Sequence, residues 1–374
     1  MPQQTECPNC AEPLDQEDVF CGACGLSLLA PEPPARPAGP EQPSAPVGRA
    51  GPDCVHCGAA EVAEDGYCEA CGGVQPRPRD HQERSLAGVA GVTDRGLRHH
   101  RNEDAFTVAA TTLPGGEPAV VAVVCDGVSS SARPDEASAA AVDAASESLL
   151  TDMEQGREPT AAMRHSINVA ARAVAALAHD GANPPGRSLN APACTYVSAV
   201  YAAGLVTIGW VGDTRAYWVP DDRAGAEPYR LTEDDSWAAR VVAAGLMGEA
   251  EAYADPRAHA ITGWLGADAE EIDPHTVSFT PHVPGVLLIC TDGLWNYAEA
   301  ATDLAEVVPA DAGTDPLGAA QVLVKFAVAA GGHDNITVAV LPITPVAADG
   351  PAHADEEYSP TLLDLPVVQP GTAD

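Results

Sequence analysis

The chain has 374 residues, and 54 acidic side chains against 19 basic ones give it a formal net charge of −35. A field of this sign repels nucleic acids and anionic membranes, so we expect neither as a partner. The longest apolar runs, "AVVAVVC" from Ala119 and "GVLLIC" from Gly285, have strand length and are too short to cross a bilayer.

Eight of the 11 cysteines form four Cys-x-x-Cys pairs, and the second two pairs repeat the first two at an offset of 47 residues. Two such pairs on short hairpins can place four thiolates around one tetrahedral Zn²⁺. The alternative is a disulfide framework or a redox-active pair. Zinc is favoured over both because the N-terminus lacks the features of a signal peptide and no thioredoxin-like unit follows. We therefore expect a cytoplasmic protein with reduced cysteines.

The cysteine pattern resembles a double zinc ribbon. The resemblance implies two structural Zn²⁺ ions, one held by Cys7, Cys10, Cys21 and Cys24 and the other by Cys54, Cys57, Cys68 and Cys71.

Changes in composition divide the chain. A stretch with seven prolines separates the ribbons and favours an extended polyproline II spacer. The end of the chain is rich in Pro, Ala, Asp and Glu, which indicates disorder. The predicted organisation is a first ribbon at 1–29, a proline-rich linker at 30–50, a second ribbon at 51–75, a linker at 76–84, a globular domain at 85–343 and an acidic tail at 344–374.

Within the globular domain the apolar pattern predicts strands separated by helices. Two long Ala-rich helices lie between clusters of strands, which favours antiparallel sheets with helices outside. Cys125, Cys194 and Cys290 lie in or beside apolar runs and are predicted to be small core residues. The predicted strands are 86–92, 105–109, 119–125, 194–202, 204–211, 214–219, 275–279, 285–290 and 335–341, and the helices are 135–153, 160–179, 235–245 and 317–330.

Five short acidic motifs are spread over this domain: Asn102-Glu103-Asp104, Asp126-Gly127, Gly212-Asp213-Thr214-Arg215, Thr291-Asp292-Gly293 and Asp334-Asn335-Ile336-Thr337. Carboxylates that converge at strand ends usually bind a cation, because burying them alone is costly. Oxygen ligands favour Mg²⁺ or Mn²⁺ over zinc. Each motif alone also fits a turn, a cap or, at Gly212–Arg215, a hairpin with a contact between Asp213 and Arg215.

In this order and context, the motifs resemble the PPM-type metal-dependent Ser/Thr protein phosphatases (protein phosphatase type 2C). The match runs from about Leu86 to Leu341 through "TDRGLRHHRNEDA", "VVCDG", "GWVGDTRAYWV", "LTEDDSW", "HAITGWLG", "LLICTDGLW" and "GGHDNITVAV". The resemblance implies an α+β fold, a four-layer α/β/β/α sandwich of two antiparallel sheets. It also implies hydrolysis of phosphoserine and phosphothreonine by a hydroxide that bridges two metal ions.

The resemblance also implies roles for single residues. Asp104 would orient metal-bound water. The metal ligands would be Asp126, which bridges both ions, Gly127 through its carbonyl, Glu103 for the second ion, Asp292 and Asp334 for the first, and Asp213 for a third, weaker one.

Two positions depart from the family's pattern. The Arg that usually precedes the Glu by four residues, and binds substrate phosphate, is replaced by His99, with Arg98 before it and Arg101 beyond. If the loop keeps the family's register, we expect His99 to contact the phosphate. If the loop is shifted, which we favour, an arginine takes over this contact, with Arg98 ahead of Arg101. The usual Gly-rich continuation after Asp126-Gly127 is replaced by Val128-Ser129-Ser130-Ser131, which leaves the loop shape and any acid for the leaving group open.

Three functions compete. The favoured one is a phosphatase acting on targets of Ser/Thr kinases, with zinc ribbons that bind a protein partner or regulate it. The alternative is a catalytically weak phosphatase-like adaptor that only binds phosphoproteins, although such a chain would be expected to lose metal ligands. Nucleic-acid binding by the ribbons is disfavoured, because residues 1–75 contain only Arg36 and Arg49 against 12 acidic residues.

Overall fold

A computed structural model describes residues 54–55, 57–59, 68–71, 75–86, 88–179, 190–269, 272 and 274–345. The first ribbon with Cys7, Cys10, Cys21 and Cys24, the linker at 30–50 and nearly all of the tail predicted from residue 344 lie outside these residues.

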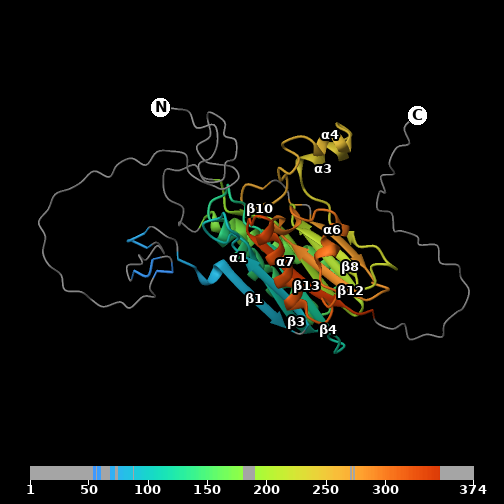
Figure 1. Ribbon diagram of the computed structural model, residues 1–374. Helices are drawn as coiled ribbons and strands as arrows, with labels where there is room; N and C mark the ends of the chain where they lie inside the picture. The colour runs from blue at the N-terminus through green and yellow to red at the C-terminus, as the bar shows by residue number, and fades with distance from the viewer. Residues whose placement is uncertain are drawn as a thin grey trace, which may run out of the picture.

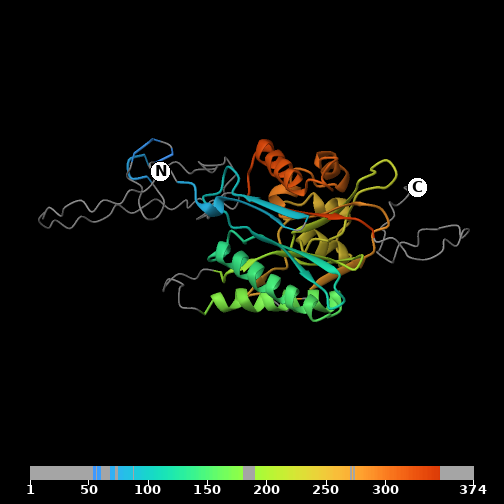
Figure 2. The same cartoon turned by 90° about the horizontal axis from the view of Figure 1, so that it is seen from below.

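The domain has two antiparallel sheets that pack face to face, with helices on both outer sides (Figure 2). One sheet has the order β1-β2-β13-β12-β8-β9, the other has the order β11-β7-β6-β4-β3, and β5 pairs separately with β10. The long pair α1 and α2 covers the second sheet, while α7 covers the first (Figures 1 and 2). The predicted four-layer α/β/β/α sandwich is thereby confirmed.

The strands are β1 (His81–Leu86), β2 (Val89–Asp94), β3 (Ala105–Thr112), β4 (Pro118–Cys125), β5 (Ala193–Cys194), β6 (Tyr196–Ala202), β7 (Leu205–Val211), β8 (Arg215–Pro220), β9 (Tyr229–Arg230), β10 (Leu265–Gly266), β11 (His275–Phe279), β12 (Gly285–Cys290) and β13 (Ile336–Ile343). The helices are the 3₁₀ turn η1 (Pro78–Asp80), α1 (Pro134–Glu154), α2 (Pro159–Leu177), α3 (Trp237–Ala243), α4 (Glu249–Tyr253), α5 (Asp292–Trp295), α6 (Ala301–Val307) and α7 (Pro316–Ala330).

Three apolar clusters hold the layers together. One lies between α1, α2 and the second sheet and includes Leu149 and Ile167, and a second lies between the sheets and includes Ile208 and Leu287. The third lies under α7 and includes Leu323. The three cysteines predicted to be core residues are fully buried, which confirms that prediction. Burial of these apolar faces is what stabilises the sandwich.

The start of the domain differs from the expectation. The segment 76–84, predicted as a linker, contains η1 and most of β1, and β1 pairs along its whole length with β2. The single strand predicted at 86–92 is therefore a hairpin, which turns at Gly88 with a φ of +85°. Every residue of β1 is exposed, so this edge strand needs no apolar residues and its sequence carries no alternating pattern.

The predicted helix at 235–245 corresponds to α3, which with α4 stands apart from the sandwich (Figure 1). The short helices α4, α5 and α6 were not predicted, because one or two turns give too short a window for a 3.6-residue period. Among the described helices, none has the length and apolar character needed to span a membrane.

Candidate functional site

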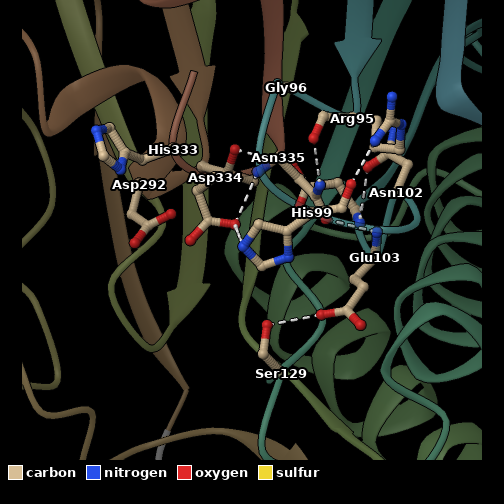
Figure 3. Close-up of polar contacts among 12 residues, drawn as sticks. Arg95, Gly96, His99, Asn102, Glu103, Ser129, Asp292, His333, Asp334 and Asn335 are labelled. Carbon is tan, nitrogen blue, oxygen red and sulfur yellow. Dashed lines mark hydrogen bonds and ion pairs between the residues drawn. The ribbon is translucent and has the colours of Figure 1, made fainter. Parts of the chain in front are cut away.

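The acidic motifs lie at the ends of the inner strands. Asp126 directly follows β4, and Asp292 begins α5 just after β12. Asp334 precedes β13, and Asp213 lies in the turn between β7 and β8. The loop between β2 and β3 brings Glu103 to the same edge (Figure 3), and Asp104 in this loop interacts with Asp126 and Asp334. The sheets therefore assemble carboxylates from positions more than 200 residues apart.

These carboxylates are close enough to perturb one another. Burial first, and then the neighbouring Asp104 and Asp292, raise the pKa of Asp126 well above its ordinary value. Burial and then Asp334 and Asp213 do the same to the pKa of Asp292. Protons, or a cation, are needed to relieve this repulsion.

Asp104 is the most deeply buried of the set, with 1% of its surface exposed. Its Oδ2 accepts hydrogen bonds from Thr291 Oγ1 at 3.0 Å and Thr337 Oγ1 at 2.6 Å. Burial nevertheless raises its pKa to about 7, against the effect of the two hydroxyls. Its Oδ1 and the Oδ1 of Asp292 are buried without a hydrogen-bond partner. Unpartnered buried carboxylate oxygens fit a site built for cations and their water.

The carboxylate and the backbone N–H of Glu103 are fixed by three hydrogen bonds. Its Oε1 accepts from Arg101 Nε at 2.9 Å and its Oε2 from Ser129 Oγ at 2.6 Å. Its backbone N–H donates to Asn335 Oδ1 at 2.6 Å (Figure 3). Ser129 belongs to the segment that departs from the family's pattern, so the departure supplies a hydroxyl to this carboxylate.

Two glycines allow the loops to approach this closely. A Cβ on Gly127 would lie 2.6 Å from the carbonyl oxygen of Pro134 and 2.7 Å from that of Glu103. Gly96 has a φ of +69°, and a Cβ there would lie 2.2 Å from the carbonyl oxygen of Asp334. Larger residues at either position would push the acidic loops apart.

His99 faces the acidic edge. Its side chain is buried, and its Nε2 lies 3.1 Å from Asp334 Oδ1 (Figure 3). Its carbonyl oxygen accepts a hydrogen bond from Arg95. Arg98 is exposed on the neighbouring position, and the guanidinium of Arg101 is already paired with Glu103. The loop thus directs an imidazole, not a guanidinium, toward Asp334.

The sequence left open a contact between Asp213 and Arg215, but the ion pair forms elsewhere. Arg215 is fully buried, binds Asp234 through Nε at 2.9 Å and Nη2 at 2.7 Å, and lies 3.5 Å above the Trp295 ring. Trp295 Nε1 donates to the carbonyl oxygen of Asp213 at 2.9 Å. The Asp213 carboxylate is left to the acidic cluster, and its pKa rises to about 7 through burial and then Asp234.

A cavity of about 840 Å³ lies between α3 and Val211, the last residue of β7. Its walls combine apolar and polar residues, among them Ile261, Trp264, Asp235, Arg240 and His275. Asp235 is held in place by Gly212 N at 2.8 Å and by His275 Nε2 at 2.8 Å.

The second cysteine group forms a compact cluster of its own. The ligand atoms of Cys54, Cys57, Cys68 and Cys71 all lie within 4.8 Å of one another, with Sγ pairs at 3.6 and 3.7 Å. Tetrahedral zinc with bonds of about 2.3 Å spaces its sulfurs by about 3.8 Å. None of the cysteines described in the structure is part of a disulfide. No three carboxylates among the described residues gather their oxygens as tightly as these sulfurs.

Sequence reasoning missed the polar residues that hold the acidic side chains. Thr291, Asn335 and Thr337 lie inside recognised motifs, and Ser129 lies in the divergent segment. Their position in or near the motifs was a usable signal. Their hydrogen-bond partners could not be predicted from the sequence, because each bond joins residues 26 to 233 positions apart.

Residues 97–314 match the family described as protein phosphatase 2C, and residues 7–72 match the double zinc ribbon. The serine/threonine phosphatase stp of Listeria innocua serovar 6a is 28% identical over 249 residues, which cover 66% of this chain and 92% of that protein.

Two solved structures are also similar. The serine/threonine phosphatase Stp1 from Staphylococcus aureus superposes with a TM-score of 0.56 at 22% identity, covering 72% of this chain and 100% of that one. The catalytic domain of the phosphatase PstP in complex with two manganese ions gives 0.52 at 23% identity, covering 69% and 96%. At these identities the structures establish the fold. Because the first family match spans more than half of the sequence, this protein phosphatase belongs to the protein phosphatase 2C family, with a double zinc ribbon ahead of its phosphatase domain.

Proposed function

We propose that this protein hydrolyses phosphoserine and phosphothreonine with two divalent cations, Mn²⁺ or Mg²⁺, bound at the acidic edge. The observation that carries the proposal is the set of converging carboxylates with raised pKa values, two of which have buried oxygens without a partner. PstP has been solved with two manganese ions, which supports this choice of metal. The proposed ligands are Glu103, Asp126, the carbonyl of Gly127, Asp292 and Asp334, with Asp213 serving a third, weaker site.

When bound, two such ions activate a water molecule for in-line attack and neutralise the phosphoryl group. Asp126 occupies the central place, because the pKa of its carboxyl responds to Asp104, Asp292, Asp334 and Asp213. Asp104, held by Thr291 and Thr337, has one oxygen left with which to orient the attacking water. Thr291 also accepts from the Thr337 backbone at 3.0 Å, so the pair is rigid before substrate arrives.

We propose that His99, in preference to Arg98, contacts the substrate phosphate. His99 is buried against Asp334, whereas Arg98 is exposed, so a one-residue shift of the loop is not needed to bring a donor to the site. A histidine offers fewer donors than an arginine, so the cations supply most of the attraction for the dianionic phosphate. This reverses the order in which the sequence placed the two residues.

The substrates are proposed to be phosphorylated proteins. We propose that the cavity between α3 and the end of β7, whose lining residue Val211 lies two positions before Asp213 in the chain, holds residues that flank the phosphorylated one. The ribbons carry an excess of acidic residues, which supports a protein partner or a regulatory role for them instead of nucleic-acid binding.

Hydrolysis of a phosphothreonine peptide tests the proposal. Asp126→Ala and Asp292→Ala should each lower kcat by about 10³-fold or more, because loss of a ligand removes several kcal/mol of charge stabilisation. Asp143→Ala, an exposed carboxylate on the outer face of α1, is the matched control and should be unaffected. Full activity in EDTA or in either site variant would rule out the metal mechanism. Metal-dependent peptide binding without turnover in the wild type would identify the protein as an adaptor.

A further inference from the structure

The loop that carries Glu103 and Asp104 is tied to a residue from the segment that follows the ribbon. Arg79, in η1, donates through Nε to the carbonyl oxygen of Asn102 at 3.0 Å and through Nη2 to that of Asp104 at 3.3 Å. Asn102 Nδ2 in turn donates to the carbonyl oxygen of Arg79 at 3.2 Å. Arg79 therefore binds the backbone of the loop on both sides of Glu103, at Asn102 and at Asp104.

The same guanidinium also reaches α1. Nη2 lies 2.6 Å from the carbonyl oxygen of Asp135, in the first turn of the helix, and 3.3 Å from Ser138 Oγ. Ser138 is buried and donates its hydroxyl to the carbonyl oxygen of Glu103. Arg79 and Ser138 thus bind the three consecutive carbonyl groups of residues 102–104. Asn335 accepts the hydrogen bond from the Glu103 N–H on the other side of the loop.

The other end of the loop is tied to the residue next to Arg79. Asp80 lies 3.5 Å from Arg95 Nε, and its carbonyl oxygen accepts from the Arg95 N–H at 2.7 Å. Arg95 in turn donates to the carbonyl oxygen of His99. Arg79 and Asp80, which are adjacent in η1, therefore hold the two ends of the loop that contains His99 and Glu103.

Arginine suits this position because its planar fork offers five donors with fixed directions. A lysine has the charge but only one nitrogen, which cannot reach carbonyl groups on two sides. A side chain without donors at position 79 would leave the partly buried carbonyl groups of the loop without hydrogen-bond partners, and the loop would be less well ordered.

We propose that Arg79 is a positioning residue for the metal centre, which fixes the Asn102–Asp104 backbone so that Glu103 and Asp104 keep their places against Asp126. The inference rests on the proposed function, because it takes these carboxylates to serve the cations. Arg79 touches none of the reacting groups. Its loss should weaken metal binding and leave recognition of the phosphopeptide unchanged.

The test is Mn²⁺ binding to the zinc-loaded full-length protein, measured from the electron paramagnetic resonance signal of free Mn²⁺. Arg79→Met should raise the Kd for Mn²⁺ by about 10-fold, the lower end of what is lost when a partner of a metal ligand is removed. The Kd of Arg79→Lys for Mn²⁺ should lie between that of the wild type and that of Arg79→Met. The matched control is Arg84→Met, on β1, which loses a 2.7 Å bond to Thr107 Oγ1 but no contact with the metal loop. Excess Mn²⁺ should restore kcat of Arg79→Met, with KM for the peptide unchanged.

A lower unfolding temperature of Arg79→Met with Mn²⁺ binding as tight as in Arg84→Met would show a merely structural role and overturn the inference. If Arg79→Met does not fold, the same comparison between Arg79→Lys and Arg84→Met decides the matter. Asp126→Ala is measured alongside. Wild-type Mn²⁺ affinity in that variant would overturn the proposed function itself, which is a result distinct from any outcome at Arg79.

Discussion

The two candidate metal sites of this chain are built in opposite ways. The cysteine cluster takes its four ligands from residues 54–71, and the sulfurs already stand at tetrahedral spacing. The acidic cluster takes its ligands from residues 103–334, and its members repel one another. Thiols can gather as neutral groups, whereas carboxylates at neutral pH must be held together by the fold. We therefore expect the ribbon to depend on its metal and the acidic site to depend on the sandwich fold.

The largest effect should follow from removing metal from the ribbon. Structural zinc contributes roughly 10–16 kcal/mol to the folding of such sites, so chelation or Cys68→Ala should unfold the second ribbon. Elemental analysis should find about two zinc atoms per chain. Deleting residues 1–75 should leave turnover of p-nitrophenyl phosphate near normal, because Arg79 and β1 begin after the cut.

By contrast, removing a ligand from the metal-free acidic site should stabilise the domain, since it relieves repulsion. Asp292→Ala in EDTA should unfold at a higher temperature than the wild type in EDTA. A ribbon that keeps its structure without zinc, or an Asp292→Ala domain that melts earlier, would contradict the contrast between the two sites.

The next largest effect concerns the phosphate. His99→Ala should raise KM for the phosphopeptide. The increase should correspond to a loss of about 1.5–3 kcal/mol of binding free energy, which is the usual contribution of one hydrogen bond that involves a charged group. Arg98→Ala, an exposed neighbour, is the control and should change KM little. A larger effect at Arg98 than at His99 would show that the loop shifts on binding substrate, as the sequence alone suggested.

A pH effect should separate the metal-free and metal-bound states. The folded pKa of Asp104, about 7, exceeds its ordinary value of 3.8 through burial. The folded state therefore binds more protons, and the metal-free domain should become more stable as the pH falls from 8 to 6. Cations need the ionised form, so the stabilisation by Mn²⁺ should grow as the pH rises.

Unfolding temperatures at pH 6, 7 and 8 check this, with and without Mn²⁺. Asp104→Asn removes the titrating group and should flatten the slope of the metal-free protein. An identical slope in wild type and Asp104→Asn would assign the pH dependence to other groups.

The smallest effect is expected at the third metal site. Asp213, proposed for a third and weaker metal, has its backbone carbonyl held by Trp295. Asp213→Ala should lower activity at limiting Mn²⁺ and regain much of it at excess, because only a weak site is lost. A loss that no concentration of Mn²⁺ repairs would place Asp213 among the essential ligands.

The sequence was enough to predict which residues are candidates for the chemistry. Cysteine spacing defined the second ribbon, because its ligands are local and a Cys-x-x-Cys hairpin needs little else. The apolar runs before Asp126 and Asp292 predicted β4 and β12 correctly, since buried strands must be apolar on both faces. The long helices α1 and α2 followed from their length and Ala content.

The tertiary structure alone decided how those residues are held. Nothing local in the sequence pairs Ser129 with Glu103, Thr337 with Asp104 or Arg215 with Asp234, because these contacts exist only once strands from distant positions meet at one edge. It also turned the expected linker into η1 and β1, whose exposed polar strand is stabilised by pairing with β2 and not by apolar burial. That pairing is what places Arg79 against the loop of Glu103.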